Sequence, residues 1–403
     1  MSSVTGNTGK FHELTINGER VAAFIPAPLP TDKRAVGVGK RATELLARAE
    51  QSLTRLDAVL GALSSLAWLG QALARREALA SVRIAGNPAT LVDLFAHDAG
   101  IQVAGTARAK AADEACGILE AFAQGSDEMA HGTGGPLISM RLLNRSHQRL
   151  TDRGGAPART PELLRRGAQA RAPGRLRTIP TWIGGTSPGS ATYVPPPPFE
   201  VNHLLKQLDN FVQHGLSHTL VRIALFQAQF ENIHPYLDGN WRLCRVVVAL
   251  LLEHWKLLRA PVLCLSSFQA RHRDDHERLL AAVRSDGDWE SWLCFFFEGL
   301  VATADDGLAA ARSLLELVSQ DRDRVLRSPD ASMAGVRLFA QLARHPIVNV
   351  PMIVKLLETT APTASKAVEL LESLGILEEV SGRQRDRVFS YERFLKLLSS
   401  GME

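Results

Sequence analysis

Residues 233–245 read IHPYLDGNWRLCR, and this stretch decides how the rest of the chain is interpreted. A strongly apolar run follows it directly, so it predicts a loop that leads into a buried helix. Gly239 and Asn240 favour a turn or left-handed backbone that points amide N–H groups at an anion where that helix begins. Arg242 and Arg245 lie on one face of the helix. The stretch therefore predicts a phosphate-binding site.

Two further residues of the stretch suit such a site. Asp238 stands directly before the turn and offers a carboxylate that can hold Mg²⁺ between phosphate oxygens. His234, followed by the stiff Pro235, is placed to act as a general base beside the bound phosphate. These residue types predict phosphate chemistry that depends on a metal ion.

The same residues resemble the motif of the Fic (Fic/Doc) family, HPFx(D/E)GNGRxxR. The matching positions are His234, Pro235, Asp238, Gly239, Asn240, Arg242 and Arg245. The resemblance implies an all-α helical bundle with a small β-hairpin flap, and transfer of AMP from ATP to a Ser, Thr or Tyr hydroxyl of a target protein. It implies catalytic roles for His234, Asp238, Arg242 and Arg245, Mg²⁺ on Asp238, and nucleotide contacts from Gly239, Asn240, Trp241, Arg242 and Arg245.

Trp241 stands where the family has a glycine in the turn around the phosphates. If position 241 requires a left-handed backbone, its side chain costs on the order of 1 kcal/mol and the indole reaches into phosphate space. In the Doc branch of the family this glycine is replaced, the nucleotide binds in the reversed sense, and a phosphoryl group is transferred. Three interpretations therefore stay open: an adenylyltransferase, a Doc-like phosphotransferase, and an inactive scaffold that acts through its C-terminal domain.

Residues 81–86 resemble the inhibitory helix of some Fic proteins, whose pattern is (S/T)xxxE(G/N). Ser81 and Gly86 match, but Ala85 replaces the glutamate that would pair with Arg245. The resemblance therefore implies that this chain lacks the inhibitory glutamate. The alternative is an ordinary amphipathic helix that ends near Gly86.

Residues 178–198 contain TWIGG and VPPPP, and they predict two short extended pieces about a Gly/Pro turn. In Fic proteins such a segment is the flap that aligns the target by strand-like pairing. Trp182, Ile183 and Gly184 carry that match, and the alternative is a hydrophobic contact that holds a long surface loop. Residues 283–296 also match a family pattern, and His276 stands where the family has a tyrosine near the adenine, so His276 is our candidate for a contact with the base.

The predicted domains follow the chain in order. They are a flexible N-terminus (1–21), an N-terminal helical region with the degenerate inhibitory helix (22–104), a Fic core (105–300), a connecting helix (301–330) and a C-terminal domain (331–403). The last reads as helix, helix, turn, helix, hairpin and helix, which predicts a winged helix-turn-helix with arginines in the wing. Such a domain binds DNA or another protein.

Composition sets the remaining expectations. The chain has 403 residues, 45% of them hydrophobic and 22% charged, as in soluble globular proteins of two or three domains. A net charge of +4 does not argue for nucleic-acid binding by the whole molecule. The four cysteines lack CxxC spacing, which predicts reduced thiols in a cytoplasmic protein, and no metal site follows from their spacing alone. We find no secretion signal and no run of about 18 apolar residues, so we expect no membrane span. Expected partners are a nucleotide and a target protein, and a homodimer stays open.

Overall fold

The computed structural model describes residues 8–30, 38–62, 67–84, 86–101, 105–131, 135–153, 173–215, 218–383 and 385–402. In these ranges the chain is mostly helical, with two small antiparallel sheets. It divides into two compact units. The first unit comprises Met1–Thr54, Gly117–Pro261 and Phe268–Ala302, and the second comprises Arg55–Cys116, Val262–Ser267 and Thr303–Glu403. This division differs from the predicted linear one, because the second unit combines N-terminal helices with the C-terminal part of the chain.

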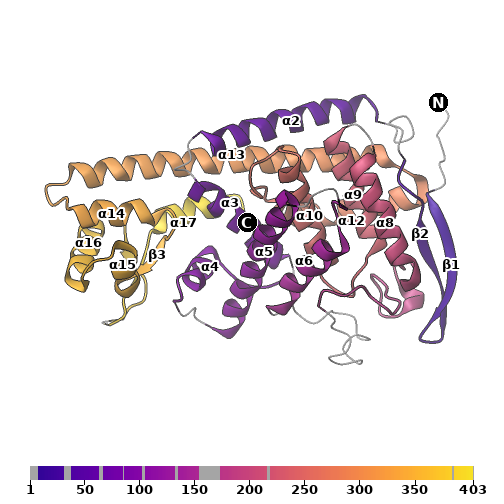
Figure 1. Cartoon of the computed structure of the whole chain (residues 1–403), viewed down its shortest axis with the longest axis horizontal. Helices are drawn as coiled ribbons and strands as arrows, with labels where there is room; N and C mark the ends of the chain where they lie inside the picture. The colour runs from indigo at the N-terminus through magenta and orange to yellow at the C-terminus, as the bar shows by residue number, and fades with distance from the viewer. Residues whose placement is uncertain are drawn as a thin grey trace. The chain divides into compact units, whose positions relative to one another are not determined.

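The first unit contains a two-stranded ribbon and most of the helices around the motif (Figure 1). Helices α2, α5, α11 and α13 each contribute to both units. The elements are β1 (Gly9–Ile16), β2 (Glu19–Pro26), α2 (Lys40–Gly61), α5 (Thr106–His131), α6 (Met140–Asp152), the 3₁₀ helix η3 (Pro188–Ser190), α8 (Pro198–His214), α9 (Thr219–Ile233), α10 (Asn240–His254), α11 (Leu265–Arg271), α12 (Arg273–Asp286) and the start of α13 (Trp289–Arg327).

The ribbon corrects one prediction. The flexible N-terminus expected for residues 1–21 is wrong for residues 9–21, which pair with the following strand in an antiparallel register from Gly9–Pro26 to Ile16–Glu19. The turn between the strands is Asn17-Gly18, and both residues have positive φ values, 54° and 86°. Asn-Gly is the dipeptide that favours two-residue hairpin turns of this kind. The Asn-Gly dipeptide therefore indicates a hairpin, but the side chains of β1 are mostly exposed and do not show the apolar pattern of a buried strand.

Helices α9 and α10 form the centre of the first unit. Almost every residue of α9 is buried, and α10 is buried from Leu243 to Leu252. The prediction that the helix after the motif is central is therefore confirmed. It begins at Asn240, because Gly239 in the left-handed region ends the loop there.

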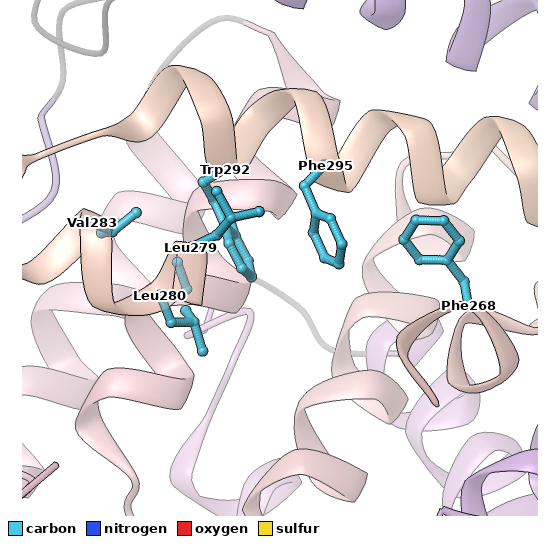
Figure 2. Close-up of a cluster of buried hydrophobic side chains, with 7 residues drawn as sticks. Phe268, Leu279, Leu280, Val283, Trp292 and Phe295 are labelled. Atoms are coloured by element: carbon cyan, nitrogen blue, oxygen red, sulfur yellow. The ribbon is translucent and has the colours of Figure 1, made fainter. Parts of the chain in front are cut away.

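An aromatic cluster packs beside α9. Figure 2 shows Trp292 and Phe295 projecting from α13 toward α12 and toward Phe268 of α11. The indole N–H of Trp292 donates to the carbonyl oxygen of Ala224 in α9 at 2.7 Å, so this buried polar group has a partner. The cluster thereby fixes α12 and α13 on the helix that carries His234.

The second unit contains α3 (Ala67–Arg83) and α4 (Leu91–Asp98), followed at the other end of the chain by α14 (Met333–Leu342), β3 (Ile347–Asn349), α15 (Val350–Leu357), α16 (Ala361–Ser373), β4 (Glu378–Glu379), β5 (Val388–Ser390) and α17 (Glu392–Ser399). The strands form a sheet in the order β3-β5-β4. The buried carboxylate of Asp321 accepts from the hydroxyl of Tyr391 at 2.8 Å and pairs with Arg324 and Arg393. These bonds fasten the C-terminal elements to α13.

The predicted separate connecting helix, residues 301–330, is also corrected. Residues 301–327 belong to α13, one helix of 39 residues. No proline occurs between Trp289 and Arg327, so nothing in the backbone chemistry forces an interruption. Among all the helices described, none has the length and apolar character needed to cross a bilayer.

Candidate active site

The loop of residues 234–239 connects α9 to α10, and both of its ends have left-handed backbone. His234 follows the last residue of α9 with φ 48° and ψ 63°, and Gly239 precedes α10 with φ 73° and ψ 2°. A left-handed residue at each end turns the chain sharply between two buried helices. For His234, which carries a Cβ, that conformation costs on the order of 1 kcal/mol, so the surrounding contacts must impose it.

Arg177 supplies the first of these contacts. Its guanidinium, only 3% exposed, donates through Nε to the carbonyl oxygen of His234 at 2.8 Å and through Nη2 to that of Ile233 at 3.4 Å. Its backbone N–H donates to the carbonyl oxygen of Pro235 at 3.0 Å. Burial lowers the pKa of Arg177 to about 10, so the group is still a cation at neutral pH. It therefore caps the C-terminus of α9, where unpaired carbonyls favour positive charge.

Tyr193 and Arg284 hold the same helix end from another side. The Tyr193 hydroxyl donates to the carbonyl oxygen of Asn232 at 2.6 Å, and the Arg284 guanidinium donates to the Asn232 side chain at 3.0 Å. The guanidinium of Arg284 also lies over the Tyr193 ring, 4.1 Å from its centroid. The last turn of α9 is thus fixed before the loop begins.

His147 of α6 holds the middle of the loop, a role that no motif in the sequence predicted. The N–H of Gly174 donates to its Nδ1 at 2.9 Å, so the proton of the neutral ring is on Nε2, which donates to the carbonyl oxygen of Asp238 at 3.0 Å. The ring stacks on Tyr236 with centroids 4.0 Å apart. Burial lowers the pKa of His147 to about 4, so it stays neutral at pH 7.

The side chain of Asn240 binds within the loop, and the nucleotide contact of this residue stays a prediction. Its side-chain nitrogen donates to the carbonyl oxygen of Tyr236 at 2.7 Å, and its side-chain oxygen accepts from the N–H of Tyr236 at 2.8 Å. The residue is 2% exposed and is the first residue of α10, so Gly239 has the left-handed backbone and Asn240 begins the helix. The side-chain amide of Asn240 thus binds both backbone groups of Tyr236 and fixes the loop against the start of α10.

The charged groups of the motif lie at the start of α10. The Asp238 carboxylate accepts from the N–H of Gly239 at 2.6 Å and is half-buried. Arg242 is half-buried, whereas Arg245 is 5% exposed and its Nη1 lies 3.5 Å from Oε1 of Gln269. The first-turn amides of a helix have no carbonyl partners within the helix, so they can donate to an anion. At the start of α10 such amides therefore lie close to the carboxylate of Asp238. One carboxylate beside the first-turn amides of a helix is a donor set that fits Mg²⁺.

The imidazole of His234 is kept neutral. Burial, reinforced by the positive charge of Arg177, lowers its pKa to about 3. Its Nδ1 is buried and, within the described ranges, makes no hydrogen bond. A neutral ring with a free nitrogen can accept a proton, and a phosphate bound close by would stabilise the protonated form.

His276 lies in the interior instead of on an open face. It is 5% exposed, and its Nε2 donates to Oε2 of the buried Glu231 at 2.7 Å. Its ring meets Trp292 edge-on at 5.3 Å. The structure thus gives His276 a partner within the aromatic cluster, and its contact with a base stays a prediction.

The segment predicted as a flap forms a short hairpin. Ile183 pairs with Tyr193 in an antiparallel bridge. Gly184 has φ 72°, and a Cβ there would lie 2.3 Å from Oγ1 of Thr192, so only glycine fits. Trp182 is 7% exposed and packs in a cluster with Ile16, Ala23 and Val194. Its side chain therefore anchors the hairpin, and the role of the segment in target docking stays a prediction.

Two family models match this chain. Residues 138–252 match the model of the Fic/DOC family, and residues 43–127 match that of the Fic/DOC family N-terminal region. The chain contains a Fic/DOC family domain. This domain spans α6 to α10 and includes the loop described above.

Solved structures share the fold of this chain at low sequence identity. A Fic family protein from Desulfovibrio desulfuricans G20 aligns with a TM-score of 0.53 and 20% identity over 90% of this chain and 98% of that one. A Fic domain containing signaling protein from Bacteroides thetaiotaomicron VPI-5482 aligns with a TM-score of 0.51 and 14% identity over 66% of this chain and 97% of that one. A probable protein adenylyltransferase from Aquifex aeolicus (strain VF5) is 35% identical over 66 residues, which is 16% of this chain and 21% of the relative. The match thus spans about a fifth of that relative's length.

Trp241 is the departure from the Fic motif, and its backbone is unstrained. It lies in the first turn of α10 and is absent from the residues with positive φ. The left-handed position in this turn is Gly239 instead. The expectation of backbone strain at Trp241 is therefore wrong. The indole lies 6.1 Å from the His276 ring, and the Arg273 guanidinium stands over it at 5.9 Å.

The residues that resemble the Fic inhibitory pattern belong to the second unit. Ser81 is 3% exposed within α3, and Gly86 has φ 85°. Ala85 lies outside the described residues. The absence of the inhibitory glutamate therefore stays a conclusion from the sequence.

Proposed function

We propose that this chain is a protein adenylyltransferase that transfers AMP from ATP to a Ser, Thr or Tyr hydroxyl of a target protein. The observation that carries the proposal is the loop of residues 234–239. Its carbonyls are bound from within by Arg177, His147 and Asn240, while it leads into the amide-bearing start of the buried helix α10. A loop held in this way presents donors to an anion without reorganising on binding.

In the proposed reaction the neutral imidazole of His234 takes the proton from the target hydroxyl. The hydroxyl oxygen forms a bond to the α-phosphorus, the bond from that phosphorus to the β-bridging oxygen breaks, and pyrophosphate leaves. The low pKa of His234, about 3, favours a neutral ring before the nucleotide binds. The negative charge of the triphosphate then raises its basicity where the proton is taken.

The remaining motif residues hold the triphosphate. Asp238 would hold Mg²⁺, which neutralises charge between phosphate oxygens. Arg242, Arg245 and the first-turn amides of α10 take up the negative charge that develops on the leaving pyrophosphate. Because Arg245 is buried, its interaction with an anion is less screened by water than that of an exposed arginine.

The hairpin at residues 183–193 suits the docking of an extended target segment. The N–H and C=O of Ile183 are bound to Tyr193 and Thr192. In an extended strand the preceding residue, Trp182, directs its backbone groups to the opposite edge. A target strand added there would have its hydroxyl aligned by main-chain pairing.

The reaction is tested by incubating the full chain with Mg²⁺ and ATP labelled on the α-phosphate, alone and with cell protein. We expect labelled protein, and we expect the label to disappear in His234→Ala and to persist in His254→Ala. His254 is an exposed histidine at the far end of α10, so it controls for the loss of an imidazole. Transfer of a γ-label instead of an α-label would assign the Doc-like phosphotransfer, and transfer of neither would refute both reactions.

We further propose that Ala85 leaves the enzyme without the family's inhibitory glutamate, that it works in the cytoplasm, and that α14–α17 act as a winged helix. In that domain Arg387 pairs with Glu372 at 3.0 Å and lies over the Phe389 ring. A wing arginine already neutralised by a neighbouring carboxylate favours a protein partner over DNA. Specific retention of a DNA fragment by the full chain would reverse that preference.

A further inference from the structure

Three side chains of different chemistry converge between α4 and α5 in the second unit. His97 and Asp98 are the last two residues of α4, and Cys116 lies on α5. The Cys116 sulfur is 3.4 Å from Nδ1 of His97 and 3.5 Å from Oδ1 of Asp98. The three ligand atoms all lie within 4.8 Å of one another. Thiolate, imidazole and carboxylate are the protein ligands of zinc.

The two measured distances match the edges of a tetrahedral site. Zinc binds sulfur at about 2.3 Å and nitrogen or oxygen at about 2.0–2.1 Å, so a tetrahedral angle puts a sulfur about 3.5 Å from each neighbouring ligand. The observed 3.4 and 3.5 Å equal this separation. We infer that Cys116 Sγ, His97 Nδ1 and Asp98 Oδ1 form a binding site for a zinc-like divalent cation.

The surrounding groups orient the ligands. Nε2 of His97 faces a carboxylate oxygen of Asp113 at 3.5 Å, which leaves Nδ1 directed at the site. Arg75 binds Oδ2 of Asp98 at 2.6 Å and leaves Oδ1 for the metal. A carboxylate behind a ligating histidine is the usual arrangement at zinc sites, because it fixes the ring and raises its basicity.

The helices that carry the ligands are themselves fixed. The first turn of α4 is closed by a capping box between Thr90 and Asp93, and Arg108 of α5 pairs with Asp93 at 2.8 Å. His97 and Asp98 stand at the C-terminal end of α4, where the helix dipole favours a cation. The cation would therefore bind to ligands whose separation the fold already sets.

The site has three protein ligands and an open side. The side chains of His97 and Asp98 are about one-third exposed, at 33% and 30%. A cavity of about 420 Å³ begins beside Asp98 and is lined by Gln71, Arg75, Phe95, Asp98, Arg344 and His345. Metal can enter from that side, and solvent supplies the fourth ligand, as in open zinc sites. Binding releases the thiol proton of Cys116 to solvent, so the affinity should rise with pH.

The inference is tested with the full chain, stripped of metal by a chelator and titrated with Co²⁺, a spectroscopic substitute for zinc. We expect one equivalent to bind, with a thiolate-to-cobalt charge-transfer band that Zn²⁺ abolishes by displacement. The band should be absent in Cys116→Ser and unchanged in Cys294→Ser, the same substitution at a buried cysteine of the first unit.

Asp113→Asn provides a second variant that leaves all three ligands in place. We expect it to weaken Co²⁺ binding by about 10- to 100-fold, the usual effect of losing a carboxylate behind a ligating histidine. A purely structural role for Asp113 would leave the metal affinity unchanged. Failure of the wild-type chain to bind stoichiometric Co²⁺, or retention of the band in Cys116→Ser, would overturn the inference. Neither result depends on the proposed adenylyltransferase activity.

Discussion

Replacing Arg177 by methionine tests whether the conformation of the loop at residues 234–239 depends on the bonds that this buried guanidinium donates to it. Methionine keeps much of the buried volume but loses the charge and both side-chain bonds to the carbonyls of Ile233 and His234. A hydrogen bond to a charged group contributes roughly 1.5–3 kcal/mol, and only the 2.8 Å bond has ideal length. We therefore expect local opening of the loop to become easier by roughly 2–4 kcal/mol, which is about 30- to 700-fold in its equilibrium constant.

The measurement is hydrogen exchange of the peptide that covers residues 230–240, followed by mass spectrometry. The His234 N–H donates to the carbonyl oxygen of Phe230 at 3.0 Å and should exchange faster in Arg177→Met by that factor. Arg177→Lys should fall in between, because an ammonium keeps the charge but cannot reproduce the planar fork. Arg175→Met is the matched control, since Arg175 is exposed and two residues away.

The pKa of His234 provides a second measurement, and the direction of its change can be predicted. The positive charge of Arg177 helps to lower the pKa of His234, so its removal should raise that pKa from about 3. A histidine NMR titration measures this. Equal exchange at residues 230–240 in wild type and Arg177→Met, or equal loosening in Arg175→Met, would refute the proposed anchoring.

Three further predictions concern other parts of the molecule. His147→Gln keeps a donor near the Asp238 carbonyl and should bind ATP nearly as wild type, whereas His147→Asn should bind about 10-fold more weakly in calorimetry. The pKa of His147 is about 4 in the folded chain and about 6.5 in the unfolded chain, so the unfolded chain binds more protons between these pH values. As the pH falls from about 6.5 to about 4, the free energy of unfolding should therefore fall by roughly 3 kcal/mol more in wild type than in His147→Gln. Urea unfolding measures this difference. Trp241→Gly should lower the thermal midpoint slightly, through lost helix propensity, and tighten ATP binding by removing the indole from the phosphate turn. Asp321→Ala should destabilise the second unit by about 3–5 kcal/mol, against little change for the exposed Asp323→Ala in thermal unfolding.

The sequence could predict the parts of the site that lie together in the chain. His234, Asp238 and Gly239 are neighbours, and their residue types alone indicate a phosphate-binding turn before a buried helix. The family resemblance extended this to the fold, which the matching domain and the solved structures support.

The supporting residues could not be predicted, because only the fold brings them to the loop. Arg177 is 57 residues from His234, and His147 is 91 residues from Asp238. Arg177 occurs in an arginine-rich stretch where nothing in the sequence separates it from Arg175, although one is 3% exposed and the other is exposed. The His97–Cys116 pair likewise depends on the packing of α4 against α5.

The left-handed backbone of His234 affects how an inactive form of this protein should be chosen. Glycine adopts the left-handed conformation without steric cost. A glycine variant would therefore remove the imidazole and also make the junction between α9 and α10 more flexible. An alanine variant loses the same ring, but its Cβ atom keeps the conformational cost of the left-handed backbone. A comparison of the two inactive forms would therefore separate the chemical contribution of the side chain from the stiffness that its main chain gives to the junction.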